Sequence, residues 1–125
     1  LLQLEIESSE YEVLHTISEK LLRCFRIIII EFHKLNQLAD RFAFKLMAPA
    51  FRKLLKSHAV VHIHPNNHRK TLKIYGLEIP ANMEVTLIRR DRLQQAKKPL
   101  VFPHPLDVRC NINKSELTLP KCWYA

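Results

Sequence analysis

The run from Phe25 to Phe32 is the sequence feature that most constrains the fold, because it is an almost unbroken series of β-branched and aromatic residues. Such runs are typical of strands that are buried on both faces, as in a parallel sheet. Sheets of that kind carry helices on their faces, so the segments before and after this strand decide the fold class.

The segment before it predicts a strand followed by a helix. Apolar and polar residues alternate from Leu1 to Ile6, and helical spacing then predicts a helix from about Glu10 to Arg23. Ser9 and Glu12 have the spacing of a capping box, in which each side chain satisfies an amide at the start of the helix.

The segment after it predicts a second helix and three more strands. An apolar stripe runs from Leu38 to Leu55, and we expect Pro49 to break or restart that helix. The expected strands are Ala59 to His64, Lys70 to Tyr75 and Met83 to Arg89. The connection from residue 66 to residue 82 contains no helix long enough for a crossover, so the closing strand pair should be antiparallel. The sequence therefore predicts an open α/β sheet.

At 125 residues the chain is long enough for one compact unit. We expect a body over residues 1–93 and a proline-rich extension over residues 94–125 that packs on it, with Trp123 and Tyr124 as anchors.

Composition argues against several classes of partner. Lys and Arg exceed Asp and Glu by 20 to 12, but the basic residues are dispersed and lack interleaved aromatic side chains, so we predict no nucleic-acid partner. The three cysteines form neither a CxxC pair nor an even set, which indicates reduced thiols and no zinc site. The longest apolar run is too short to span a bilayer and no leader is visible, so we predict a cytoplasmic protein without membrane contact.

Glycine is nearly absent, since Gly76 is the only one. A nucleotide-type cofactor loop generally needs several glycines for its tight turn and close backbone approach. The chain also begins at Leu1, inside a strand-like run and without methionine. We therefore expect an upstream half to be missing, and we expect the exposed sheet edge to pair with that half or with a second copy.

The segment LQLEIESSEYEVL, residues 2–14, resembles the motif lKiDiEGaEyevL of the FkbM-type methyltransferases, in which an acidic residue ends the fourth strand. Glu5 falls on the family's aspartate, and Glu7 and Glu10 fall on its glutamates. The sequence departs from the motif at Glu5, which is one methylene longer, and at Ser8, which replaces the glycine.

Three further segments carry the same resemblance. IIIIEFH is similar to the end of the family's fifth strand, which carries an acidic residue and a histidine or aromatic. VVHIHPNN, followed by YGLEIPANMEVTLIRRD, and the tail PLVFPHPLDVRCNINKSELTLPKCWY resemble the end of one branch of the family. The resemblance thus spans nearly the whole chain.

The resemblance implies the C-terminal half of a Rossmann-like class I methyltransferase sheet, with parallel strands and a closing antiparallel pair. It implies S-adenosylmethionine as cofactor and a small-molecule methyl acceptor, most readily a hydroxyl of a sugar or secondary metabolite. The site residues expected on this basis are catalytic Glu5, Glu10 and His33, cofactor-binding Glu5 and Glu7, and substrate-binding Glu31, His62, His64, Asn66 and Asn67, with no metal ligand.

Strand geometry supports part of this site. Glu31 and His33 point to one face of a strand, and ligands collect at the carboxyl ends of parallel strands, so Glu5 and Glu7 should join them in one crevice. The alternative is that Glu31 and His33 only form a hydrogen-bonded pair. For the whole chain the alternatives are an inactive truncated remnant, a small basic module for an acidic partner, and a metal-dependent hydrolase that uses Glu31, His33, His62 and His64.

Overall fold

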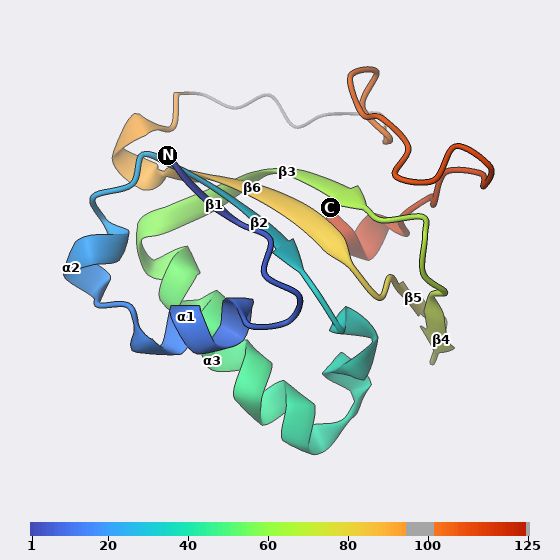
Figure 1. The fold of residues 1–125 in the computed structure, drawn as a ribbon, viewed down its shortest axis with the longest axis horizontal. Coiled ribbons are helices and arrows are strands. Elements are labelled where there is room, and N and C mark those ends of the chain that lie inside the picture. Colours follow the sequence, from blue (N-terminus) through green and yellow to red (C-terminus); the bar gives the residue numbers. More distant parts are fainter. Residues whose placement is uncertain (95–101, 125) are drawn as a thin grey trace.

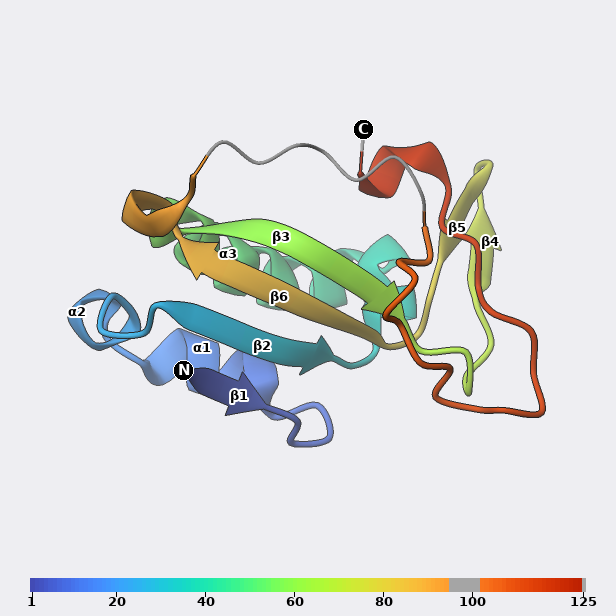
Figure 2. The same cartoon turned by 90° about the horizontal axis from the view of Figure 1, so that it is seen from above.

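A computed structural model describes residues 1–94 and 102–124. Its main sheet has four strands in the order β1-β2-β6-β3, formed by Leu2–Leu4, Ile27–Phe32, Met83–Arg89 and His58–Pro65. β1 and β2 are parallel, whereas β6 runs antiparallel to both β2 and β3 (Figure 2). The predicted mixed α/β class and the antiparallel closing pair are confirmed. The insertion of β6 between β2 and β3 was not predicted.

The core lies between this sheet and the helices. Ile28, Ile30 and Phe32 alternate along β2 and are completely or almost completely buried, and Val85 and Leu87 of β6 continue the same layer. Because alternate residues of a strand point to opposite faces, the residues between them, such as Ile29 and Glu31, face the other side of the sheet. The predicted central strand is therefore real, but only one of its faces is fully covered.

The helices α1 (Glu10–Thr16), α2 (Glu19–Leu22) and α3 (Arg41–Ser57) lie together on one side of the sheet, and the short 3-10 turn η1 (Leu35–Ala39) leads into α3 (Figure 1). None of the helices within the described residues is long and apolar enough to cross a bilayer.

The prediction of one helix from Glu10 to Arg23 was wrong. The chain turns to an extended conformation at Ile17, where ψ is 133°, and Ser18 starts a new helix by accepting a hydrogen bond from the Leu21 amide at 3.1 Å. The predicted capping box was also wrong, since the Ser9 side chain makes no cap hydrogen bond. Ser18 is itself a good N-cap, and its bond to the amide three residues on offsets the interruption of the helix.

Pro49 does not break α3, contrary to the prediction, because packing outweighs its missing amide. Met47, Ala50 and Leu54 are buried on this helix, and burying an aliphatic side chain the size of leucine or methionine contributes about 1.5–3 kcal/mol. The predicted stripe is only partly core, since Phe42 at the start of α3 is 80% exposed.

A separate hairpin, β4 (Leu72–Ile74) and β5 (Leu77–Ile79), precedes β6. Tyr75 and Gly76 form its turn, and both have positive φ, 48° and 75°. Two-residue turns of this type match the twist of the strands. The predicted strand from Lys70 to Tyr75 is found as β4, while its partner β5 was not predicted.

The C-terminal extension runs over the sheet face opposite the helices, beside β3 (Figure 1). Its Leu119 is buried, and its Trp123 donates a hydrogen bond through Nε1 to the Glu78 carbonyl at 3.1 Å. The Tyr124 ring lies 4.6 Å from that of Phe102, centroid to centroid. A short 3-10 turn, η2 (Arg90–Arg92), precedes the extension, and another, η3 (Lys121–Trp123), lies within it. Residues 95–101 and 125 of the predicted unit lie outside the described residues.

Candidate acid–base site at the carboxyl ends of β1 and β2

The loop between β1 and α1 is a tight turn that a buried carboxylate holds. Glu7 and Ser8 have φ values of 53° and 87°, a region that L-residues rarely adopt. Glu10 Oε1 accepts hydrogen bonds from the Ile6 amide at 3.1 Å and, less closely, from the Ser8 amide at 3.4 Å. The residue with the more extreme φ, Ser8, is the one that stands where the FkbM-type motif has glycine.

The same carboxylate binds the imidazole of His33. His33 Nδ1 lies 2.8 Å from Glu10 Oε1, and the two side chains are 7% and 0% exposed. An ionised carboxylate only accepts hydrogen bonds, so Nδ1 donates, and the neutral ring then has its basic lone pair on Nε2. Glu10 therefore fixes both the orientation and the tautomer of His33. Glu10 contacts the ring on the Nδ1 side and lines neither of the two cavities described below.

Tyr11 holds the backbone of His33 from the other side. Its hydroxyl donates to the His33 carbonyl at 2.8 Å. Burial raises the pKa of the Tyr11 phenol well above its ordinary value, and the negative charge of Glu10 raises it further. The phenol thus remains a protonated donor throughout the neutral and moderately alkaline range.

The ring nitrogen that Glu10 leaves open, Nε2, faces two more carboxylates. It lies 3.6 Å from Glu7 Oε2 and 3.6 Å from Glu31 Oε2. These separations are too long for direct hydrogen bonds, so Nε2 retains its capacity to bind a ligand group or a water. The structure therefore brings Glu7, Glu31 and His33 together, and the hydrogen bond of His33 goes to Glu10 instead of to Glu31.

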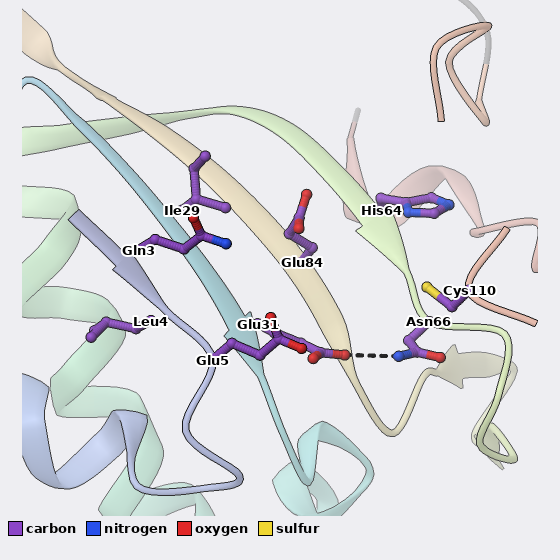
Figure 3. Close-up of a pocket in the computed structure, with 9 residues that line it drawn as sticks. All are labelled: Gln3, Leu4, Glu5, Ile29, Glu31, His64, Asn66, Glu84 and Cys110. Atoms are coloured by element: carbon purple, nitrogen blue, oxygen red, sulfur yellow. Dashed lines mark hydrogen bonds between the residues drawn. The ribbon is translucent and has the colours of Figure 1, made fainter. Parts of the chain in front are cut away.

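One cavity lies next to Glu31 on the sheet face opposite the helices and has a volume of about 220 Å³ (Figure 3). We call it the sheet-face cavity. Carboxylates at the ends of three strands line it, those of Glu5, Glu31 and Glu84. Asn66 Nδ2 donates to Glu31 Oε1 at 2.8 Å and so fixes the central one. Cys110 also lines it, and burial together with the charge of Glu31 raises the pKa of that thiol.

A second cavity lies where the loops that follow β1, β2 and β3 meet, and it has a volume of about 540 Å³. We call it the loop cavity. His33 and Glu7 form one part of its lining, and Lys34, Arg69 and Lys70 form another. His33 itself lines the loop cavity, and Glu31, whose Oε2 lies 3.6 Å from His33 Nε2, lines the sheet-face cavity.

The remaining predicted residues bind the C-terminal extension. His62 Nε2 lies 2.8 Å from Asp107 Oδ1, and His64 Nε2 lies 2.6 Å from Glu116 Oε1. The Asn67 side chain donates to the carbonyls of residues 111, 114 and 115 and accepts from the amide of residue 111. Of the predicted substrate-binding residues, the sheet-face cavity is lined by Glu31, His64 and Asn66, and is not lined by His62 or Asn67.

Within residues 1–94 and 102–124, no group of three or more His, Cys, Asp or Glu side chains is arranged to hold a metal ion. In particular, His62 and His64 are directed at carboxylates of the extension. The geometry gives the metal-dependent hydrolase alternative no support.

Sequence reasoning missed the cations of the loop cavity and the burial of Glu10. Lys34 and the pair Arg69 and Lys70 come from loops 35 or more positions apart in the sequence, so no local pattern joined them. The motif did contain a signal for the burial of Glu10, its third acidic residue. This residue follows a turn with positive φ, and the backbone amides of that turn need a hydrogen-bond acceptor.

The sequence matches no protein-family model and no curated protein, and the fold matches no solved structure. A function for this chain therefore has to be argued from its residues and their geometry.

Proposed function

We propose that this chain provides the acid–base and acceptor-binding part of an S-adenosylmethionine-dependent methyltransferase of the FkbM type, with a hydroxyl group of a sugar or secondary metabolite as acceptor. The observation that carries the proposal is the pair formed by Glu10 and His33. A fully buried carboxylate fixes the imidazole of His33, which lines the loop cavity, and the other ring nitrogen lies 3.6 Å from Glu31, which lines the sheet-face cavity.

The position of this pair in the fold supports the proposal. Ligands of open α/β sheets bind beyond the carboxyl ends of the strands, and the pair lies beyond the carboxyl ends of the parallel strands β1 and β2. The φ of 87° at Ser8 is a second support, because the turn has kept a backbone conformation that suits the glycine of the family motif.

The described residues fit only one end of the implied cofactor. Gly76 lies in the β4–β5 turn and lines neither the sheet-face cavity nor the loop cavity. What does fit is the acidic wall of the sheet-face cavity, where Glu5 and Glu31 would face a cationic sulfonium. When bound, S-adenosylmethionine supplies an electrophilic methyl group on that sulfonium.

The contribution of this chain to the reaction is to orient the acceptor and to remove its proton. An acceptor hydroxyl in the loop cavity would donate a hydrogen bond to His33 Nε2. That nitrogen would take up the proton as the oxygen gains the methyl group, whose bond to the sulfonium sulfur breaks and leaves its electron pair on sulfur. The buried carboxylate of Glu10 stabilises the imidazolium that results, and the proton then leaves to water. Positioned general bases contribute about 10²–10⁴-fold to a rate.

Calorimetric titration with S-adenosylhomocysteine, on a sample shown to be folded by circular dichroism, tests the proposal. We expect saturable binding of S-adenosylhomocysteine, a neutral thioether, that Glu5→Gln leaves nearly unchanged. Binding of S-adenosylmethionine should fall at least about tenfold in Glu5→Gln, because only this ligand has a sulfonium charge for the carboxylate to attract. Glu12→Gln removes the same charge from an exposed position on α1 and serves as the matched control.

The thermal unfolding of the same samples gives an independent reading. A ligand present at about a hundred times its dissociation constant stabilises the folded state by ~2.7 kcal/mol. A flat titration together with an unchanged unfolding temperature, in a folded sample, would contradict the proposal for this chain. His33→Gln should leave the affinity for S-adenosylhomocysteine unchanged, because in the proposal that side chain contacts the acceptor and not the cofactor.

A further inference from the structure

We infer that the loop cavity binds an anionic group, a phosphate or a carboxylate, so that the acceptor belongs to the class of sugar phosphates and sugar acids. The anion site stands on the geometry of the cavity, and only its assignment to a methyl acceptor rests on the proposed function.

The cationic side of the cavity comes from two separate loops. Lys34 follows β2 directly and has a φ of 59°, an uncommon backbone conformation for a residue other than glycine. Arg69 and Lys70 lie in the turn between β3 and β4. All three line the same recess as His33. Two loops thus bring three positive charges to the cavity that contains the proposed base.

These cations have no carboxylate partner in the described part of the chain. None of the three takes part in an ion pair there, and the only carboxylate that lines the cavity is that of Glu7. The Glu7 side chain is 84% exposed and lies on the His33 side. The cavity therefore has a net positive charge, and an incoming anion does not have to displace an internal partner.

A basic recess elsewhere in the described part of the molecule shows the opposite arrangement. It lies at the far end of the sheet and is lined by Arg23, Lys56, Arg89 and Arg90. The Arg89 guanidinium donates to both oxygens of Asp91, at 2.6 and 3.1 Å, and to the Arg23 carbonyl. Lys56 donates to Glu19, and Arg90 donates to the Leu55 carbonyl. These cations stabilise the fold, whereas those of the loop cavity are available to a ligand.

Neutral polar groups complete the loop cavity in a way that suits a polyol. Asn36, Gln37 and Asn82 line it together with Ser8. Amide side chains both donate and accept, so they can bind hydroxyl groups in either sense. An anionic head group at the lysines would leave a hydroxyl-bearing ring between these amides, within reach of His33 Nε2.

A titration of the ¹⁵N-labelled chain followed by NMR tests the inference with defined probes: inorganic phosphate, glucose 6-phosphate, glucuronate and glucose. We expect the anionic probes to shift the amides of Ser8, Lys34, Lys70 and Asn82, and at least one of the two anionic sugars to bind about tenfold or more tightly than glucose. The stronger of these two identifies the group as phosphate or carboxylate.

Two variants and a matched control locate the effect. Lys34→Asn removes one charge and keeps a residue that adopts positive φ readily, and Arg69→Gln with Lys70→Gln removes two charges from an exposed turn. Each should weaken binding of the anionic sugar by about fivefold or more. Lys45→Gln removes the same charge from the exposed surface of α3 and should change nothing.

Equal affinity for glucose and for both anionic sugars would overturn the inference, as would shifts centred on Arg89 and Arg90. If Lys45→Gln weakens binding of the anionic sugar as much as the loop-cavity variants do, only the overall charge of the protein matters, and the inference would again be overturned. The titration with S-adenosylhomocysteine uses other residues and another ligand. A failure of the anion site and a failure of the proposed methyltransferase function are therefore distinguishable.

Discussion

Replacing Ser8 by glycine should stabilise this protein, although glycine usually destabilises. Ser8 has a φ of 87°, and the left-handed region costs an L-residue about 1–2 kcal/mol. Glycine avoids that cost, but its additional loss of backbone entropy on folding is about 0.5–1 kcal/mol. The difference predicts that Ser8→Gly raises the free energy of unfolding by ~0.5–1 kcal/mol.

The neighbouring serine provides a matched control. Ser9 has an ordinary φ of −82° and makes no cap hydrogen bond through its side chain. Ser9→Gly therefore brings the entropy cost without relief of strain, and we expect it to lower the free energy of unfolding by up to about 1 kcal/mol. The same chemical change at adjacent positions should thus have effects of opposite sign.

Urea unfolding followed by circular dichroism measures both variants. With a slope of ~2 kcal/mol per molar urea, the midpoint should rise by ~0.3–0.5 M in Ser8→Gly and fall by up to a similar amount in Ser9→Gly. If both midpoints fall by the same amount, the turn does not strain Ser8. The backbone argument for the family motif would then be wrong.

Three other predictions concern the core of the site and the extension. Glu10→Ala leaves a buried amide and a buried ring nitrogen without their acceptor and should destabilise by about 3 kcal/mol in urea unfolding, against less than about 0.5 kcal/mol for the exposed Glu12→Ala. Burial raises the pKa of Tyr11, so the phenol loses its proton at a lower pH in the unfolded chain than in the folded protein. The free energy of unfolding should therefore fall as pH rises above ~10, and Tyr11→Phe should abolish that part of its pH dependence. Leu119→Ala should cost about 2–5 kcal/mol, because the side chain is buried, while Leu106→Ala, at an 82% exposed position, should cost less than about 0.5 kcal/mol. Equal effects of the two leucine variants would show that the extension does not pack on the body.

The sequence predicted the elements whose pattern is local. β2 and β6 were found because runs of β-branched residues and alternation are visible along the chain itself. The sheet order was not found, because β2, β3 and β6 are all apolar and nothing in their composition says which one lies in the middle. The interruption at Ile17 was missed for a related reason, since the helical spacing of apolar residues continues across it.

The site was predicted in part, and for a physical reason. Glu31 and His33 were expected beside Glu7 because carboxyl ends of parallel strands share one edge. In the structure, Glu7 Oε2 and Glu31 Oε2 each lie 3.6 Å from His33 Nε2. The burial of Glu10 was not expected, because a glutamate in a helix is exposed by default. His62 and His64 were assigned to substrate, whereas the structure pairs them with carboxylates of the extension. The sequence of the extension has no periodic pattern from which its path could be predicted.

The position of β6 affects how this protein can fold. β6 is the last strand within residues 1–94 and 102–124, and it pairs on one side with β2, where Ile27 lies opposite Ile88, and on the other with β3. Neither β2 nor β3 has its central neighbour until β6 has been synthesised. The sheet is thus completed by contacts between residues that are distant in sequence. Such contacts slow folding, because the entropy of closing the loop is lost before the contacts stabilise the chain.

During synthesis, α1 and α2 can form before the sheet is complete. The edges of β2 and β3 that face each other across β6 stay unpaired until residues 83–89 have been made. Unpaired strand edges are templates for association between chains. A ribosome stalled before residue 83 would therefore present β3 without a neighbour and β2 with only β1 beside it. This nascent chain should need a chaperone until β6 emerges and inserts between β2 and β3.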